Sequence, residues 1–259
     1  MNRISNAFKN ENGKAFIAFI TAGDPDIRKS EEFILEMVKA GADLIEIGIP
    51  FSDPIAEGKV IEAANTRALS CGTTTDTVFE LVQSVRSKTQ VPLVLLTYLN
   101  PVFKYGYEKF FKRCNSTGID GIIIPDLPFE EKGELADYAE QNDVRIISLI
   151  APTSKERIKR IAESSSGFIY LVSSMGVTGI RDSIDTDLVS IISDIRTYTD
   201  TPVAIGFGIS SPEQARKLGA ISDGVIVGSA IVKIIAQHGQ NAAPFIYEFV
   251  RSMKTELIA

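Results

Sequence analysis

The sequence predicts a single (β/α)8 barrel over residues 1–259. Three observations support this prediction. Short apolar runs rich in β-branched residues recur eight times, segments of helical period separate them, and 259 residues is the usual length of one α/β barrel. Continuous apolar strands that alternate with helices form a parallel sheet covered on both faces. Eight such units favour closure into a barrel over the alternative, a doubly wound open sheet.

The predicted strands lie at regular intervals along the chain. They are FIAFI (16–20), LIEIGI (44–49), LVLLTY (93–98), GIIIPD (121–126), RIISLI (145–150), GFIYLV (167–172), VAIGFG (203–208) and GVIVGS (224–229). Between the first two, SEEFILEMVKAGAD has a helical apolar face made of Phe33, Ile34, Met37 and Val38, and it ends at Gly41. Similar endings, STGID and LGAISD, precede GIII and GVIV. The chain therefore repeats a helix stop, a polar hinge and a strand.

Composition and charge exclude several classes of function. The net charge is −6, from 33 acidic and 27 basic residues, and no basic run indicates nucleic-acid binding. No apolar stretch is long enough to span a bilayer, and the first residues do not resemble a signal peptide. Cys71 and Cys114 lack metal-like or redox-like spacing, which indicates reduced thiols in a cytoplasmic protein. With one histidine, His238, acid–base chemistry would depend on carboxylates and tyrosines.

The segments after the last two strands predict a phosphate site. Gly206 and Gly208 allow a ligand to approach the backbone closely, and Ser210 or Ser211 can cap the next helix. After the last strand, Gly228 and Ser229 open a helix whose free N–H groups could bind an anion. These are the two loops at which barrels of this kind often hold phosphate. The alternative is that the glycines only make tight turns.

Two further features indicate an enzyme. Segment 173–187, SSMGVTGIRDSIDTD, is longer than an ordinary βα loop and suits a lid. In LIEIG, alternation places Ile45 and Ile47 toward the helices and Glu46 inside the barrel. The other strands offer almost no basic partner there, so burial should raise the pKa of Glu46 toward neutrality, as a general acid or base requires. Tyr170 is a second polar residue within a strand. The alternative is a structural glutamate paired with a lysine or arginine.

Six segments together resemble the α subunit of tryptophan synthase. They are EIGIPFSDPIAEG, TYLNPVFKYG, IIPDLPFEE, GVTG, GFGIS and GSAIVKII, and the match runs in order from about residue 4 to about residue 250. The resemblance implies a (β/α)8 barrel lyase of tryptophan biosynthesis that cleaves indole-3-glycerol phosphate to indole and glyceraldehyde 3-phosphate. It implies no metal or organic cofactor in this chain. The implied partner is a β subunit that uses pyridoxal phosphate, in an α2β2 assembly.

The resemblance also implies roles for individual residues. The indole C3 must be protonated while the C3–C1′ bond breaks, and Glu46 is implied as the acid/base. Glu57 stands where the family has an aspartate that accepts from the indole N–H, and Tyr170 lies beside them. The other implied positions are an indole pocket of Phe19, Leu96, Tyr98 and Phe207, a phosphate cradle of Gly179, Gly208, Gly228 and Ser229, the lid residue Thr178, and β-subunit contacts at Pro50, Asp53 and Asn100.

This sequence departs from the family in the loop after the second strand. The usual DPxADGP reads DPIAEGK here, so Glu57 replaces aspartate and Lys59 replaces proline. Glu57 keeps a carboxylate at this position, on a side chain one methylene longer than aspartate. We expect the lyase activity to persist but to depend more on the β subunit. Three alternatives remain: a stand-alone lyase that releases indole, a catalytically weak barrel that mainly binds and activates the β subunit, and another phosphosugar barrel such as an isomerase.

Overall fold

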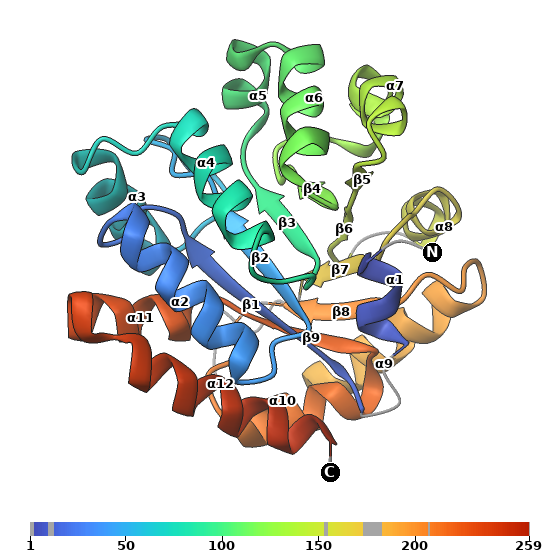
Figure 1. Ribbon diagram of the computed structural model, residues 1–259. Coiled ribbons are helices and arrows are strands. Elements are labelled where there is room, and N and C mark those ends of the chain that lie inside the picture. The colour runs from blue at the N-terminus through green and yellow to red at the C-terminus, as the bar shows by residue number, and fades with distance from the viewer. Residues whose placement is uncertain (1–2, 10–12, 153–154, 173–182, 207, 259) are drawn as a thin grey trace.

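Nine parallel strands form one sheet that curls into a barrel surrounded by helices (Figure 1). The computed structural model describes residues 3–9, 13–152, 155–172, 183–206 and 208–258. The strands are β1 (Ala15–Thr21), β2 (Leu44–Gly48), β3 (Leu93–Leu96), β4 (Gly121–Ile123), β5 (Arg145–Ile146), β6 (Ser148–Ile150), β7 (Ile169–Val172), β8 (Val203–Gly206) and β9 (Gly224–Val227). Their order in the sheet is β5-β4-β3-β2-β1-β9-β8-β7-β6.

The barrel closes through the fifth predicted strand, which is divided at Ile147. Its first part, β5, pairs with β4, and its second part, β6, pairs with β7. The Ile147 N–H donates to the carbonyl of Ile122 at 2.9 Å, so the chain passes from one neighbour to the other without a break. The predicted eight-stranded barrel is therefore confirmed, and the open-sheet alternative is wrong.

The helices surround this barrel in the described part of the chain. They are α1 (Arg3–Phe8), α2 (Ile27–Lys39), α3 (Lys59–Ser70), α4 (Thr75–Arg86), α5 (Leu99–Tyr105), α6 (Tyr107–Thr117), α7 (Gly133–Gln141), α8 (Lys155–Glu163), α9 (Ser183–Arg196), α10 (Pro212–Ile221), α11 (Ser229–His238) and α12 (Ala243–Ile258). The C-terminal α12 packs against α10 and α2 (Figure 1). Gly41 follows the end of α2 with φ +106°, as its predicted role as a helix stop requires.

Side-chain alternation divides the core into two apolar layers. The layer inside the barrel contains Leu44, whereas Ile45 and Ile47 belong to the layer between strands and helices. The predicted orientation of β2 is thus confirmed. Helix α1 closes the amino-terminal end of the barrel, because Ile4 is fully buried in the inner layer and the Phe8 ring lies 5.5 Å from that of Phe168 (Figure 1). The carboxyl ends of the strands remain as the mouth.

Three aspartates at the amino-terminal end repeat one hydrogen-bond pattern. Asp43, Asp120 and Asp223 directly precede the second, fourth and eighth predicted strands. The carboxylate of each accepts from the backbone N–H of the first residue of the preceding predicted strand. The bonds run from Phe16 to Asp43 at 2.7 Å, from Leu93 to Asp120 at 2.9 Å and from Val203 to Asp223 at 2.9 Å. The N–H of each aspartate donates back to the same partner's carbonyl. The polar hinge of the weak sequence repeat therefore contains an aspartate whose hydrogen bonds align adjacent strands.

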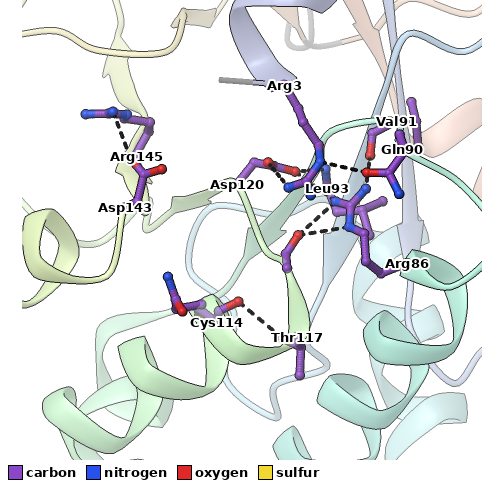
Figure 2. Close-up of polar contacts among 12 residues, drawn as sticks. Arg3, Arg86, Gln90, Val91, Leu93, Cys114, Thr117, Asp120, Asp143 and Arg145 are labelled. Carbon is purple, nitrogen blue, oxygen red and sulfur yellow. Dashed lines mark hydrogen bonds and ion pairs between the residues drawn. The ribbon is translucent and has the colours of Figure 1, made fainter. Parts of the chain in front are cut away.

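A basic side chain neutralises each of these aspartates. Lys254 of α12 lies 2.7 Å from Asp43, and Arg196 of α9 lies 3.1 Å from Asp223. Asp120 has two such partners, Arg3 and Arg86, each at 2.9 Å (Figure 2). These ion pairs attach helices that are distant in sequence to the amino-terminal end of the barrel.

Segment 173–187 differs from its predicted form as one long loop. Its last part, from Ser183, begins helix α9, and residues 173–182 lie outside the described residues. Serine, aspartate and threonine are common both in loops and in the first turn of a helix, so the polar sequence SIDTD did not distinguish the two.

Candidate active site

A cavity of about 280 Å³ opens at the carboxyl ends of the strands. Residues from five strands line it: Phe19 of β1, Glu46 of β2, Leu96 of β3, Tyr170 of β7 and Ile226 of β9. The rest of the wall comes from residues 56–58 before α3, Ile61 of α3, residues 208–210 after β8, and Gly228 with the first part of α11. Chemistry is expected at this end of the barrel, because the βα loops there vary without disturbing the core.

Within the described ranges of the chain, Glu46 is a carboxyl group buried without a counter-ion. It is 2% exposed, and among the described residues its Oε2 has no hydrogen-bond partner. Burial, and secondly the nearby Glu57 carboxylate, raise the pKa of Glu46 to about 8. At neutral pH the group is therefore mainly a neutral acid that faces the cavity and can give up a proton.

The raised pKa of Glu46 makes stability depend on pH. An ordinary value of 4.5 in the unfolded chain against about 8 in the native state means that the native state binds more protons between these pH values. The free energy of unfolding should fall as pH rises through this window, by up to about 1.4 kcal/mol per unit. Glu46→Gln cannot titrate, so we expect its Tm advantage over the wild type to grow from pH 5 to pH 8. Parallel melting profiles would contradict this.

Tyr170 lies beside Glu46 and is held by the shape of the neighbouring strand. A Cβ atom added to Gly206 would lie 2.4 Å from the Tyr170 hydroxyl, so the glycine makes room for this ring. The sequence suggested that Gly206 allows a ligand to approach, and the structure adds that its missing side chain makes room for Tyr170. Burial, and secondly the charge of Glu46, raise the pKa of Tyr170, which keeps the hydroxyl protonated.

Glu57 forms the opposite carboxylate of the cavity and is partly buried. The Asn65 side-chain amide donates to Glu57 Oε2 at 2.7 Å. Burial raises the pKa of Glu57, and the hydrogen bond from Asn65 is the largest influence in the opposite direction. Glu57 and Glu46 thus occupy different environments, one hydrogen-bonded and one not, which is how enzymes separate the roles of two carboxyl groups.

The two helices that follow the last strands differ at their first turns. Helix α10 is capped, because the Ser211 hydroxyl accepts from the Gln214 N–H at 3.3 Å and Gln214 Oε1 accepts from the N–H groups of Ser210 and Ser211. Helix α11 begins after Gly228 with no side-chain cap. Its first N–H groups lie at the cavity wall, where Ser229 and Ala230 are lining residues. The first N–H groups of α11 are therefore better placed to bind an anion than those of α10, which already have partners.

Most predicted site residues that the structure describes meet at this cavity. Those that line it are Glu46, Glu57, Tyr170, Phe19, Leu96, Gly208, Gly228 and Ser229. Tyr98 is not a lining residue; it is 1% exposed, its ring lies 5.4 Å from that of Phe51, and its hydroxyl accepts from the Ala56 N–H at 3.2 Å. Phe207, Thr178 and Gly179 lie outside the described residues.

The predicted partner contacts lie outside the cavity. Pro50 is buried in this chain, whereas Asp53 and Asn100 are exposed. Two large apolar side chains near these positions are unusually exposed, Ile55 in the loop before α3 at 77% and Phe103 in α5 at 68%. Large exposed apolar side chains of this kind are typical of an interaction surface.

Sequence analysis missed Lys233, a cation at the cavity wall. It belongs to α11 and follows Ser229 by four residues, so both lie on one face of the helix. The signal was present in the segment GSAIVK, because side chains of a helix lean toward its amino terminus. Within the described ranges, no cluster of acidic, cysteine and histidine side chains could hold a metal ion, and no helix is long and apolar enough to cross a membrane.

A closed (β/α)8 barrel with a buried carboxylic acid and an uncapped helix start at its mouth is typical of barrel enzymes. Comparison with known proteins specifies the family: the model described as tryptophan synthase alpha chain matches residues 5–257, and this chain belongs to that family. The tryptophan synthase alpha chain of Lacticaseibacillus casei is 48% identical over 259 residues, covering 100% of this chain and 97% of the relative.

Solved structures of the family have the same fold. The α subunit of Legionella pneumophila superposes with a TM-score of 0.91 at 33% identity, covering 99% of this chain and 98% of that one. A chain from the tryptophan synthase α2β2 complex of Pyrococcus furiosus gives a TM-score of 0.87 at 37% identity, covering 93% of this chain and 98% of that one.

Proposed function

We propose that this chain cleaves indole-3-glycerol phosphate to indole and glyceraldehyde 3-phosphate, with Glu46 as the proton donor. The observation that carries the residue assignment is the buried, unpaired carboxyl group of Glu46 at the cavity wall. Its pKa of about 8 keeps it protonated at neutral pH, as protonation of the indole C3 requires. The reaction is a carbon–carbon lyase reaction of tryptophan biosynthesis.

One proton transfer into the substrate and one out of it complete the cleavage. Glu46 gives its proton to C3 of the indole, and positive charge develops at the indole nitrogen. The C3–C1′ bond then breaks, its electron pair restores the aromatic ring, and C1′ becomes the aldehyde carbon. The hydroxyl proton at C1′ returns to the Glu46 carboxylate, which regenerates the acid. Atoms and charges balance with no group beyond the side chains of this chain.

Glu57 and the apolar wall have complementary tasks in this scheme. The Glu57 carboxylate accepts from the indole N–H and stabilises the positive charge that develops there. Phe19 and Leu96 enclose the flat apolar ring and exclude water, which strengthens that interaction. The Tyr170 hydroxyl, protonated beside Glu46, is a hydrogen-bond donor for the reacting end.

The substrate phosphate binds, in this proposal, at the first turn of α11, with Gly208 across from it and Lys233 as a counter-charge. Lys233→Met should raise the KM for indole-3-glycerol phosphate about five- to tenfold, because an exposed charge pair contributes about 1 kcal/mol. The kcat should stay unchanged, since the contact is the same before and during the reaction.

Salt dependence separates this role of Lys233 from a general effect of charge. The increase in KM should shrink as ionic strength rises. Lys112→Met removes an exposed cation of α6 on the outer surface, so it changes the net charge equally and should leave KM unaltered. Equal KM values for wild type and Lys233→Met at low salt would contradict the assignment.

The chain works with a β subunit, as the family does. Supporting features are exposed side chains at two places: Asp53 and Ile55 in the loop that precedes α3, and Asn100 and Phe103 in α5. The partner would supply pyridoxal phosphate for the following step, and no cofactor is proposed for this chain. Because Glu57 and Lys59 replace the usual aspartate and proline, we expect the partner to raise kcat strongly.

The experiment that tests this function follows indole release from indole-3-glycerol phosphate by absorbance, with and without a β subunit. Indole formation that increases when the β subunit is added supports the proposal. A chain that releases no indole under either condition, but still activates the β subunit, would indicate a binding partner without lyase activity. Equal rates with and without the partner would favour a stand-alone lyase.

A further inference from the structure

Asn65 is a buried polar residue that the reaction scheme leaves without a task. It lies nearly two turns into α3, is 4% exposed, and carries an amide that donates to Glu57 Oε2 at 2.7 Å. Buried amide groups are normally hydrogen-bonded, and the partner of this one is a carboxylate of the cavity wall rather than a backbone group. A hydrogen bond to an ionised acceptor is about twice as strong as a neutral one.

The position of Asn65 explains how the longer side chain of Glu57 is accommodated. Glu57 precedes the amino-terminal cap of α3, Gly58, and Asn65 points back toward that end because helix side chains lean toward the amino terminus. The bond therefore folds the Glu57 arm over the first turns of α3. Tyr98 holds the same loop, since its hydroxyl accepts from the Ala56 N–H at 3.2 Å.

A neutral donor suits this location better than a cation. An arginine or lysine beside Glu57 would neutralise the negative charge that the indole N–H needs and that helps to keep Glu46 protonated. Lys59 is the cation closest in sequence, and in the described part of the chain it makes no ion pair with Glu57. The carboxylate is thus fixed in place without losing its charge.

We propose that Asn65 is a positioning residue for the lyase reaction, which holds one oxygen of Glu57 so that the carboxylate can accept from the indole N–H. This inference rests on the proposed function and adds to it the group that orients the acceptor. A carboxylate has about four acceptor sites, so the bond to Asn65 leaves capacity for the substrate. Fixing an acceptor before the reaction is how enzymes gain most from a single hydrogen bond.

The test is a double-mutant cycle with Asn65→Ala and Glu57→Ala, measured by indole release. Asn65→Ala should lower kcat and kcat/KM together by about ten- to a hundredfold, because the lost contact acts on charge that develops in the transition state. In the Glu57→Ala background the same change should lower the rate less than about threefold, since Asn65 acts through Glu57. Thr66→Ala is the control and should match the wild type, because Thr66 is an exposed neighbour on α3 whose hydroxyl donates to the Glu62 carbonyl.

The pH profile provides a second measurement that a purely structural role would not change. Asn65 lowers the pKa of Glu57, so its loss should move the acidic limb of kcat/KM to higher pH. Binding of inorganic phosphate should be unaffected, because the phosphate site lies at α11. If Asn65→Ala unfolds, Asn65→Ser keeps a donor and should retain more activity than the alanine variant does at permissive temperature.

The outcomes separate this inference from the function beneath it. An active wild type with Asn65→Ala within threefold of it would overturn the inference alone. Equal losses in both backgrounds would also overturn it, because they would show that Asn65 does not act through Glu57. An inactive wild type, with or without a β subunit, would overturn the proposed function and this inference together.

Discussion

Glu46→Gln should lower the kcat for indole release by about 10²–10⁴, because the amide cannot donate a proton to C3. The substitution preserves the shape and burial of the side chain, so the cavity should still bind substrate and KM should change little. The wild-type value of kcat/KM should fall as pH rises through about 8, where the acid loses its proton. The measurement is steady-state indole release from pH 6 to pH 9 with the β subunit present.

Glu80→Gln is the matched control for this experiment. Glu80 is exposed on α4, and its replacement makes the same chemical change, carboxyl to amide, without touching the cavity. It should retain wild-type kcat and the same alkaline limb. A wild type as slow as Glu46→Gln would favour the catalytically weak barrel, and an active Glu46→Gln would remove Glu46 from the reaction.

Asp120→Asn should lower the free energy of unfolding by about 3 kcal/mol, because it breaks a buried ion pair on one side only. Asp120 is 7% exposed and accepts from Arg86, Arg3 and the Leu93 N–H, each at 2.9 Å (Figure 2). The neutral amide would leave the Arg86 guanidinium, 12% exposed, without its counter-ion. Equilibrium urea unfolding at pH 7 measures the loss.

Asp143→Asn provides the control for Asp120→Asn, because it makes the same chemical change at the surface. Asp143 is 73% exposed and its pair with Arg145 at 3.0 Å is open to water (Figure 2). Exposed pairs contribute about 0–1 kcal/mol, so this variant should unfold almost as the wild type does. Similar losses for the two variants would show that burial does not govern the strength of the Asp120 pair.

The two expected results illustrate opposite uses of a buried carboxyl group. Asp120 is surrounded by donors at the closed end of the barrel, where it aligns β3 and β4 and attaches α1. At the open end, Glu46 Oε2 finds no donor among the residues that the structure describes, and burial holds the group as a neutral acid in the native state. The buried carboxylate at the closed end of the barrel therefore stabilises the fold. The buried carboxyl group at the open end, where we propose that the reaction takes place, costs stability.

The sequence by itself determined the strands, their parallel arrangement and the inward direction of Glu46. These features depend on local rules, because apolar runs, helix stops and two-residue alternation are properties of neighbouring residues. The chain also carried family segments long enough to indicate the reaction. Segment 183–187 was misread as loop since its polar residues suit both a loop and a helix start.

Only the tertiary structure decided which residues surround Glu46 and Glu57. The division of the fifth strand at Ile147, the space that Gly206 leaves for Tyr170, and the amide of Asn65 on Glu57 each join positions whose distances follow from closure of the barrel. The proposal of α11 rather than α10 as the anion site likewise depended on which helix start already had its N–H groups occupied. Such contacts arise from packing between elements, and no periodicity within one element contains them.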